Sequence, residues 1–202
     1  ERIFEPLGMA HSVVAEGDRL IPGRATGYYS RGTGFIGNPY NLDPSTQFAS
    51  SGIVTNTGDL LAWDQALATS KLLSQASRDE MFAAHRNDYA YGVQTGERFG
   101  RRKLDHSGSS DGFSSYLLRF PDERLTVIVL GNGDRMSAGR AGTSLAAIAL
   151  GETYAMPRPQ LRDMLGDTLA QDGVDAAMLQ YHDLKRTQPD QGGIGLQAAP
   201  SI

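Results

Sequence analysis

Residues 113–131 carry the pattern that most limits what this chain can fold into, because they indicate two β-strands joined by a short turn. The segments FSSYLLRF at 113–120 and LTVIVLG at 125–131 are rich in aromatic and β-branched residues, with the turn PDER between them. The second strand is apolar almost throughout, which is typical of a strand covered on both faces. The sequence therefore predicts an antiparallel sheet with helices packed against it.

Segments on both sides of this hairpin indicate the rest of the sheet and its helices. The segment YAYGVQTGERFGRRKLDHSG, residues 89–108, predicts two more strands joined by a turn at Gly96 or Gly100. Helices are predicted at 57–69 and 137–150, and their expected caps are Asn56 or Thr57, Ser137 and Gly151. We expect both helices to lie outside a sheet in which the neighbouring strands are 101–107, 113–120 and 125–131.

The composition excludes several classes of function. Lysine and arginine total 19 against 23 aspartate and glutamate, without a basic run, so nucleic acid is not an expected partner. The absence of cysteine excludes disulfides, thiolate catalysis and cysteine-ligated zinc, but it leaves the cellular compartment open. No apolar run approaches the roughly 20 residues of a membrane span. His11, His85 and His182 are isolated in the sequence, so we expect no metal and no cofactor.

The segment GSSDG at 108–112 matches the G-x-S-x-G pattern of a nucleophile elbow. An elbow needs a helix directly after the serine, whereas a strand is predicted here, so the elbow interpretation fails. Asp105, His106 and Ser107 cannot form a local triad either, because adjacent strand residues point to opposite faces. The glycine-rich strand end indicates instead a substrate-clamping and oxyanion-binding edge whose nucleophile lies elsewhere.

Several longer phrases resemble the serine β-lactamase and penicillin-binding-protein group, in particular its class C-like branch of β-lactamases, esterases and D-amino-acid peptidases. The phrases are ERIFEPLGM, SSGIVTNTGDLLAWDQAL and HSGSSDGFSSYLLRFPDERLTVIVLGN, in that order, and the resemblance covers about residues 1–152. It implies an α+β fold, an antiparallel β-sheet flanked by helices, as part of a β-lactamase/transpeptidase-like domain. It also implies acyl-enzyme hydrolysis in a periplasmic or secreted protein.

The resemblance assigns roles to four residues of the third motif. His106 takes the place of the motif's lysine, and Ser107 takes the hydroxyl position. Gly108 is the small residue that leaves room for substrate, and Ser109 would donate the second backbone N–H of the oxyanion hole. An N–H aimed at a developing oxyanion typically lowers the barrier by a few kcal/mol. We therefore expect His106 and Ser109 to be catalytic, and Ser107 and Gly108 to bind substrate.

Two motifs of the family are absent from the sequence. No serine is followed three residues later by lysine, and no Tyr-x-Asn or Ser-x-Asn occurs. Both motifs lie upstream of the ERIFEPLGM phrase in the family, so we expect this chain to be a C-terminal portion that is inactive by itself. The substrate stays open among a β-lactam, an ester and a D-amino-acid peptide. The alternative is a non-catalytic binding or assembly module derived from the same fold.

The sequence also predicts how the chain is divided. We expect a hydrolase portion at 1–156, a helical appendage at 157–188 and a disordered tail at 189–202. The appendage reads as two amphipathic helices broken near Asp172-Gly173. A hydrolase portion without its upstream half would expose apolar surface. The expected partners are therefore the missing N-terminal portion or a second copy of the chain, besides a small-molecule substrate.

Overall fold

A computed structural model of the chain describes residues 2–15, 20–31, 35–37, 50–110, 112–134, 136–154 and 161–187. The chain forms two compact units. The first holds residues 1–29 and 37–156, and the second holds residues 30–36 and 157–202. Among the described residues, no helix combines the length and the apolar character needed to cross a bilayer. The expected tail, 189–202, lies outside the described residues.

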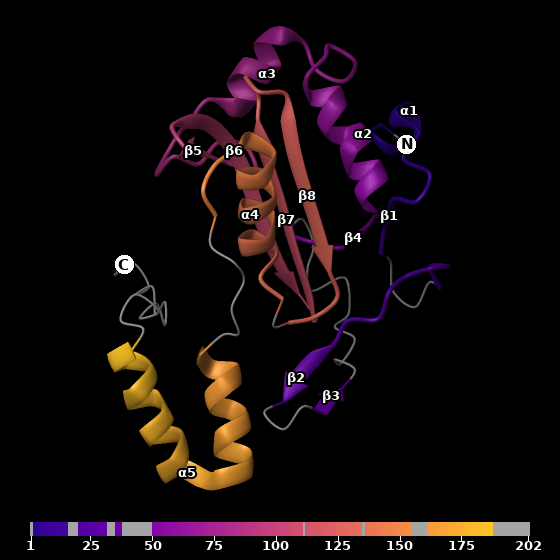
Figure 1. Cartoon of the computed structure of the whole chain (residues 1–202). Coiled ribbons are helices and arrows are strands. Elements are labelled where there is room, and N and C mark those ends of the chain that lie inside the picture. The colour runs from indigo at the N-terminus through magenta and orange to yellow at the C-terminus, as the bar shows by residue number, and fades with distance from the viewer. Residues whose placement is uncertain are drawn as a thin grey trace. The chain divides into compact units, whose positions relative to one another are not determined.

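The first unit contains a four-stranded antiparallel sheet with the strand order β5-β6-β7-β8 (Figure 1). Its strands are β5 (Gln94–Arg98), β6 (Arg101–Ser110), β7 (Phe113–Phe120) and β8 (Leu125–Gly131). Consecutive strands are therefore neighbours throughout, so local hairpins build the whole sheet. This arrangement confirms the expected neighbourhood of 101–107, 113–120 and 125–131. A strand at 113–120 also rules out the nucleophile elbow.

The turn between β5 and β6 consists of Phe99 and Gly100, so Gly100 rather than Gly96 joins the two strands. Both turn residues have positive φ, 56° and 67°, as in the type I′ turns that match the twist of a hairpin. A positive φ is unusual for a bulky residue. The ring of Phe99 stacks on that of Phe120 with centroids 6.4 Å apart, and this packing against the core helps hold the turn.

Three helices of the first unit follow or precede the sheet strands in the chain: α2 (Thr57–Leu67), α3 (Gln75–Phe82) and α4 (Ala138–Leu150). The expected caps are confirmed. The Asn56 side chain accepts the Asp59 N–H at 2.8 Å, and Ser137 Oγ accepts the Arg140 N–H at 3.3 Å. Gly151 ends α4 in the left-handed conformation, with φ 70°. Each cap satisfies backbone groups that a helix end leaves without partners.

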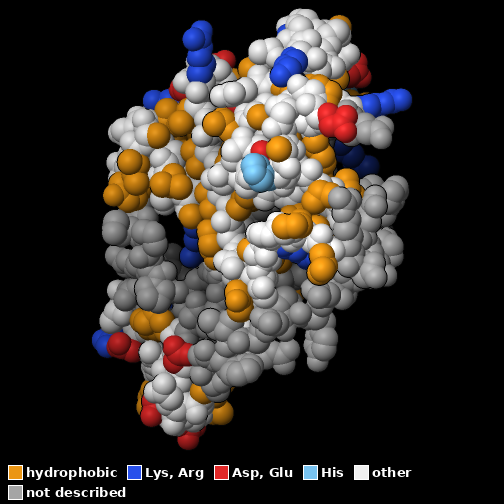
Figure 2. Space-filling view, turned by 90° about the vertical axis from the view of Figure 1, so that its right-hand side faces the viewer, with side chains coloured by type: hydrophobic (Ala, Val, Ile, Leu, Met, Phe, Trp, Pro, Cys, Tyr) orange, Lys and Arg blue, Asp and Glu red, His pale blue; other side chains and the backbone are white. Residues whose placement is uncertain are grey.

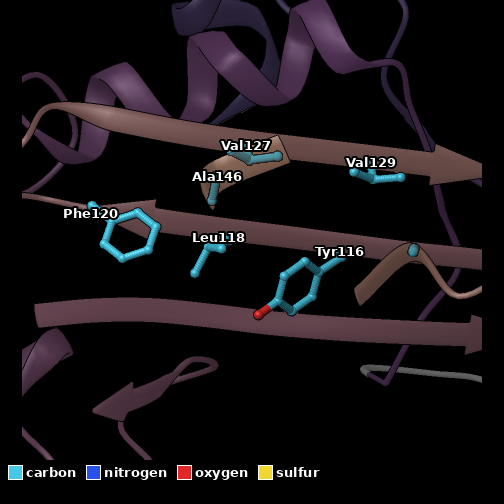
Figure 3. Packing of buried hydrophobic residues seen from close by; sticks show 7 residues of the cluster. Tyr116, Leu118, Phe120, Val127, Val129 and Ala146 are labelled. Carbon is cyan, nitrogen blue, oxygen red and sulfur yellow. The ribbon is translucent and has the colours of Figure 1, made fainter. Parts of the chain in front are cut away.

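Helix α4 packs on one face of the sheet. Alternate residues of β7 and β8 point toward it and form the main core with Ala138 and Ala146 of the helix (Figure 3). The strand residues of this core are Tyr116, Leu118, Phe120, Val127 and Val129. The helix approaches closely at Gly142, where a Cβ atom would lie 2.6 Å from Tyr116 Cδ1.

Helix α2 packs on the opposite face. Arg119 and Thr126 alternate with the core residues and therefore point away from α4. Thr126 Oγ1 donates to Asp64 Oδ2 of α2 at 2.8 Å, and Arg119 Nε lies 3.6 Å from Asp64 Oδ1. Asp64 is buried, and the paired cation compensates part of the cost of burying its charge. Strand β8 is thus covered on both faces, as its apolar sequence predicts.

Short elements complete the first unit. Strand β1 (Val13–Val14) pairs with β4 (Ile53–Val54), and the four-residue helix α1 (Phe4–Leu7) packs against α2. The sequence suggests that Pro6 ends this helix, but Pro6 lies inside it and Gly8 ends it with φ 69°. A proline fits there because the first N–H groups of a helix have no intrahelical acceptor.

The second unit contains a helical hairpin. Helix α5 (Leu161–Thr187) is broken at Gly173, whose φ of 86° and ψ of 179° are not helical. The chain folds back there, and the two arms run side by side (Figure 1). Thr168 Oγ1 of the first arm donates to Gln180 Oε1 of the second at 2.6 Å. The break confirms the interruption expected near Asp172-Gly173. A separate pair of strands is formed by β2 (Tyr29–Arg31) and β3 (Phe35–Gly37).

Candidate functional site

The four candidate site residues lie next to one another on β6 but point to two faces of the sheet. His106 and Gly108 pair with Leu117 and Ser115 of β7, on the face of α2. Ser107 and Ser109 pair with Tyr116 and Ser114, on the face of α4. Since neighbours on a strand face opposite ways, His106 cannot act as a base for Ser107.

The open end of β6 has a free edge. Strand β5 pairs with β6 only as far as Gln94 opposite Asp105. Within the described parts of the chain, no strand lies along β6 beyond Asp105 on that side. A free strand edge presents N–H and C=O groups to an extended ligand, which can bind as an added strand. The four candidate residues therefore lie on the only stretch of β6 that has β7 as its single strand partner among the described elements.

His106 is exposed, and Tyr89 contacts it. Tyr89 Oη lies 2.8 Å from His106 Nε2, and the two rings meet edge to face with centroids 5.9 Å apart. A neutral imidazole has one donor and one acceptor nitrogen, so a partner on Nε2 helps decide which nitrogen carries the proton. The contact also orients the ring and leaves Nδ1 as its other polar atom.

A tight turn places Tyr89 beside His106. Asn87 and Asp88 have positive φ, 52° and 57°, and the Tyr89 N–H donates to Arg86 O at 2.9 Å. Thr95 of β5 fixes this turn through its N–H and its hydroxyl, which donate to Asp88 O at 2.7 Å and 3.0 Å. The sequence pattern predicts Tyr89 to be part of a strand and does not indicate its contact with His106. The adjacent Asn-Asp pair indicates the turn, since both residues tolerate the left-handed conformation, but it does not indicate the contact with His106.

Small side chains shape the sheet surface next to His106. A Cβ on Gly108 would collide with Ser115 Oγ on the paired strand, although Ser115 Cβ itself would be 3.8 Å away. A larger residue at 108 therefore requires the Ser115 hydroxyl to turn away, and it also fills the space above the strand. Glycine keeps this part of the surface open to a ligand.

The end of the β6–β7 hairpin is fixed by a crossing segment. The Tyr28 N–H donates to Asn132 O at 3.0 Å, and the Asp134 N–H donates to Tyr28 O at 3.0 Å. Gly112 of the hairpin turn has a φ of 79°, and a Cβ there would lie 2.5 Å from Tyr28 N. Only glycine fits both the conformation and the close backbone contact.

A buried polar cluster lies on the α4 face, behind the free edge. Asp105 accepts a hydrogen bond from Tyr116 Oη at 2.6 Å, and it also pairs with Lys103 Nζ. Burial, together with the hydrogen bond to Asp105, raises the pKa of Tyr116 well above its usual range. Asp105 therefore lies on the face opposite His106, and its carboxylate binds Tyr116 and Lys103 there. In the same described ranges, no cluster of three or more His, Asp or Glu side chains could hold a metal ion.

The architecture defines a class of protein before any sequence comparison. It is an α+β domain whose antiparallel sheet has a helix on each face and an accessible strand edge carrying histidine, serine and glycine. The sequence profile of the Beta-lactamase family matches residues 1–150, and the chain belongs to this family.

Relatives and solved structures agree with this assignment. The chain is 28% identical over 163 residues to a D-aminopeptidase of Gluconobacter oxydans. The aligned residues cover 77% of this chain and 30% of that protein. It is 32% identical over 111 residues to a penicillin-binding protein of Bacillus subtilis, covering 50% of this chain and 24% of the relative. The chain thus spans less than a third of the length of these relatives.

Solved structures also share the fold. The octameric penicillin-binding protein homologue from Pyrococcus abyssi superposes with a TM-score of 0.65 at 22% identity, covering 75% of this chain and 36% of that one. The D-stereospecific amidohydrolase from Streptomyces gives a TM-score of 0.63 at 21% identity, covering 75% and 47%. The expected α+β fold of the penicillin-binding-protein type is confirmed, and the solved neighbours are longer.

Proposed function

We propose that this chain forms the substrate-binding wall of a serine acyl-hydrolase. The observation that carries the proposal is the free edge of β6 beyond Asp105, which presents the backbone of residues 106–109 beside an exposed histidine. An extended substrate binds along this edge by main-chain hydrogen bonds, and its reacting carbonyl lies near the glycine-rich end. Membership of the Beta-lactamase family supports this arrangement.

Each candidate residue has a role in this proposal. His106, on the face of α2, donates a hydrogen bond to the substrate or attracts a negative group of the substrate by its positive charge. Gly108 keeps the surface open, and the Ser107 hydroxyl binds a polar group of the substrate. The Ser109 backbone N–H donates to the carbonyl oxygen as negative charge develops on it during attack by a serine hydroxyl.

The substrate class follows from the shared chemistry of acyl transfer. A strained lactam, an activated ester and a peptide bond can each acylate a serine and give a serine ester intermediate. The names of the D-aminopeptidase and D-stereospecific amidohydrolase relatives favour amides that contain a D-amino acid. We therefore propose such amides as the principal substrates, with β-lactams and esters as probes of the same site.

The nucleophile in this proposal comes from polypeptide outside the 202 residues, because no Ser-x-x-Lys occurs in them. Residues 1–156 form the hydrolase portion, residues 157–188 form a helical appendage and the tail follows at 189–202. The 202-residue chain by itself is inactive in this proposal, because its sequence contains no Ser-x-x-Lys to supply the nucleophile and its base.

Intact-mass measurement after incubation with a β-lactam and an activated ester tests the proposal. The 202-residue chain should gain no acyl group, whereas a polypeptide that also contains the upstream coding sequence should gain one, on an upstream serine. Stoichiometric acylation of Ser107, Ser109 or Ser110 in the short chain would contradict the proposal.

A matched pair of variants tests the role of the β6 edge in the longer polypeptide. Gly108→Val fills the surface beside His106 and should slow acylation at least about tenfold, in line with a lost oxyanion or substrate contact. Arg102→Val changes an exposed residue of the same strand and face, and it should leave acylation unchanged. Equal effects of both variants would mean that the edge does not bind substrate.

The second candidate function is a non-catalytic binding or assembly module. The strand edge of β6 beyond Asp105 is compatible with it as well, because such an edge can bind an extended peptide without any chemistry. The coding sequence upstream of Glu1 separates the two functions, because Ser-x-x-Lys and Tyr-x-Asn there support the hydrolase, and a start codon directly before Glu1 supports the module. The free edge of β6 would then bind an extended peptide without cleaving it.

A further inference from the structure

The helical hairpin α5 exposes apolar side chains on both of its arms. Leu169 is 50% exposed on the first arm, and Val174, Met178 and Leu179 are 65%, 49% and 73% exposed on the second. An isolated pair of helices buries only the sides that face each other. Much of the apolar surface of this hairpin therefore has no cover within the arms themselves.

Three of these side chains lie on one side of the hairpin. Thr168 and Gln180 are hydrogen-bonded across the arms, and Ala177 is half-buried, so these residues mark the inner sides. Each helical residue advances about 100°, so Leu169 lies about 100° past Thr168. Met178 lies about 100° past Ala177 and about 160° from Gln180, toward the outer part of the same side. Because the arms are antiparallel, the same rotation brings both onto one side. Val174, one turn before Met178, extends this apolar face.

Charge is distributed unequally along the hairpin. The segment 163–184 contains five aspartates and no lysine or arginine, and the basic residues Lys185 and Arg186 follow it. Asp172 and Asp175 flank the break at Gly173, whereas Lys185 lies 12 residues beyond it, about 18 Å along the arm. In Figure 2, red side chains lie at the lower tip of this unit, and both red and blue ones lie toward its upper end.

We propose that the apolar face of α5, defined by Leu169, Val174 and Met178, is a dimerisation surface for a second copy of this chain. Two hairpins associate antiparallel about a two-fold axis and form a four-helix bundle. The acidic tip of each hairpin then lies against the basic end of the other. This proposal goes beyond the proposed hydrolase function and does not depend on it.

Charge complementarity is the reason for choosing a second copy as the partner. A two-fold axis perpendicular to the arms places Asp172 and Asp175 of each copy opposite Lys185 and Arg186 of the other. Arg186 Nη2 also lies 2.7 Å from Asp183 Oδ1 of its own arm, but with Lys185 this end keeps a net positive charge, so opposite charges favour the register. The same axis passes near Met178, about midway along the second arm, so the two Met178 side chains meet. A parallel arrangement would instead place the two acidic tips against each other.

Sedimentation equilibrium of the full 202-residue chain tests the surface. Met178→Asp should raise the dimer dissociation constant at least about tenfold, because it buries a charge at the centre of the interface. The control Leu145→Asp changes a side chain on the outer side of α4 that is 51% exposed, and it should leave the dimer intact. Circular dichroism confirms that both variants keep their helices.

A charge-swap experiment tests the partner and its orientation. One variant carries Asp172→Lys and Asp175→Lys, and the other carries Lys185→Glu and Arg186→Glu. Each variant alone should dimerise at least about tenfold more weakly than the natural chain, because like charges then meet at both ends. An equimolar mixture should recover the natural dissociation constant by forming heterodimers.

Three outcomes would overturn the proposal. The natural chain could remain a monomer at all concentrations, which would mean that the apolar face is covered within one chain. Leu145→Asp could weaken association as much as Met178→Asp, which would place the interface elsewhere. A mixture of the charge-swap variants that associates more tightly than the natural chain would indicate parallel hairpins.

Discussion

At the scale of single residues, the contact between Tyr89 Oη and His106 Nε2 leaves Nδ1 as the imidazole nitrogen without this partner. We expect Tyr89 Oη to donate to Nε2, so that the neutral His106 ring carries its proton on Nδ1. Tyr89→Phe removes this donor and should shift the tautomer toward a protonated Nε2. Nitrogen-15 chemical shifts of the labelled imidazole measure the tautomer directly in the 202-residue chain.

The same variant separates the ring contact from the catalytic proposal. Unchanged nitrogen shifts in Tyr89→Phe would show that Tyr89 does not set the tautomer of His106. That result would leave the role of the β6 edge in acylation untouched, because the free edge does not depend on Tyr89.

Asp59 makes the stability of the first unit depend on pH. Burial alone would raise its pKa, but hydrogen bonds from Ser12 Oγ at 2.7 Å and the His11 N–H at 2.9 Å, with the nearby His11 ring, lower it below the usual value. A carboxylate with a lowered pKa in the folded state stabilises the protein above its unfolded pKa of 3.8. This stability is lost as the pH falls through the folded pKa.

Asp59→Asn tests this linkage. The free energy of unfolding of the variant should be about 1–3 kcal/mol lower at pH 7, which is the magnitude of hydrogen bonds to a charged group. Urea unfolding from pH 7 to below pH 3 should show a smaller loss of stability for the variant than for the natural chain. Parallel pH profiles would mean that Asp59 keeps an ordinary pKa in the folded chain.

At the scale of elements, the β6–β7 hairpin depends on one glycine. Gly112→Ala places a side chain at a φ of 79° and brings its Cβ to 2.5 Å from Tyr28 N. Both effects strain the turn. The free energy of unfolding should fall by about 1–3 kcal/mol. Thermal or urea unfolding measures the change.

Gly139→Ala is the matched control for this element. Gly139 lies in α4, and a Cβ there has no neighbour within 4 Å. Alanine favours a helix over glycine, so this variant should be neutral or more stable by up to about 1 kcal/mol. Equal destabilisation by both variants would show that the crossing at Tyr28 does not restrict the turn.

At the scale of the whole chain, the core clusters contain residues of the first unit alone among the residues that the structure describes. Removal of residues 157–202 should therefore leave the urea midpoint of the sheet unchanged within error. The Trp63 fluorescence of α2, whose side chain packs in the core of the first unit, reports this transition. A shift of the midpoint by more than about 1 kcal/mol in free energy would show that the two units stabilise each other.

The sequence by itself determined the elements whose cause is local. The hairpin at 113–131, the caps at Asn56 and Ser137 and the break at Gly173 were all predicted correctly. A turn, a cap or a kink depends on the backbone preferences of a few adjacent residues, which a short stretch of sequence contains. The four candidate residues on β6 were named from the resemblance to the family's third motif, and their roles stay predictions. Their alternation between two faces follows from the pleat of any strand.

Only the tertiary structure decided which distant residues meet. Tyr89 was read as part of a strand, and nothing in its neighbourhood in sequence points to His106, 17 residues away. The contact between Asp64 and Thr126 and the free edge of β6 also depend on how separate elements pack. Such contacts arise because burying apolar surface on both faces of the sheet fixes the helices and strands in one arrangement. The local sequence pattern predicts which residues form a strand, and tertiary packing determines which residues that strand contacts.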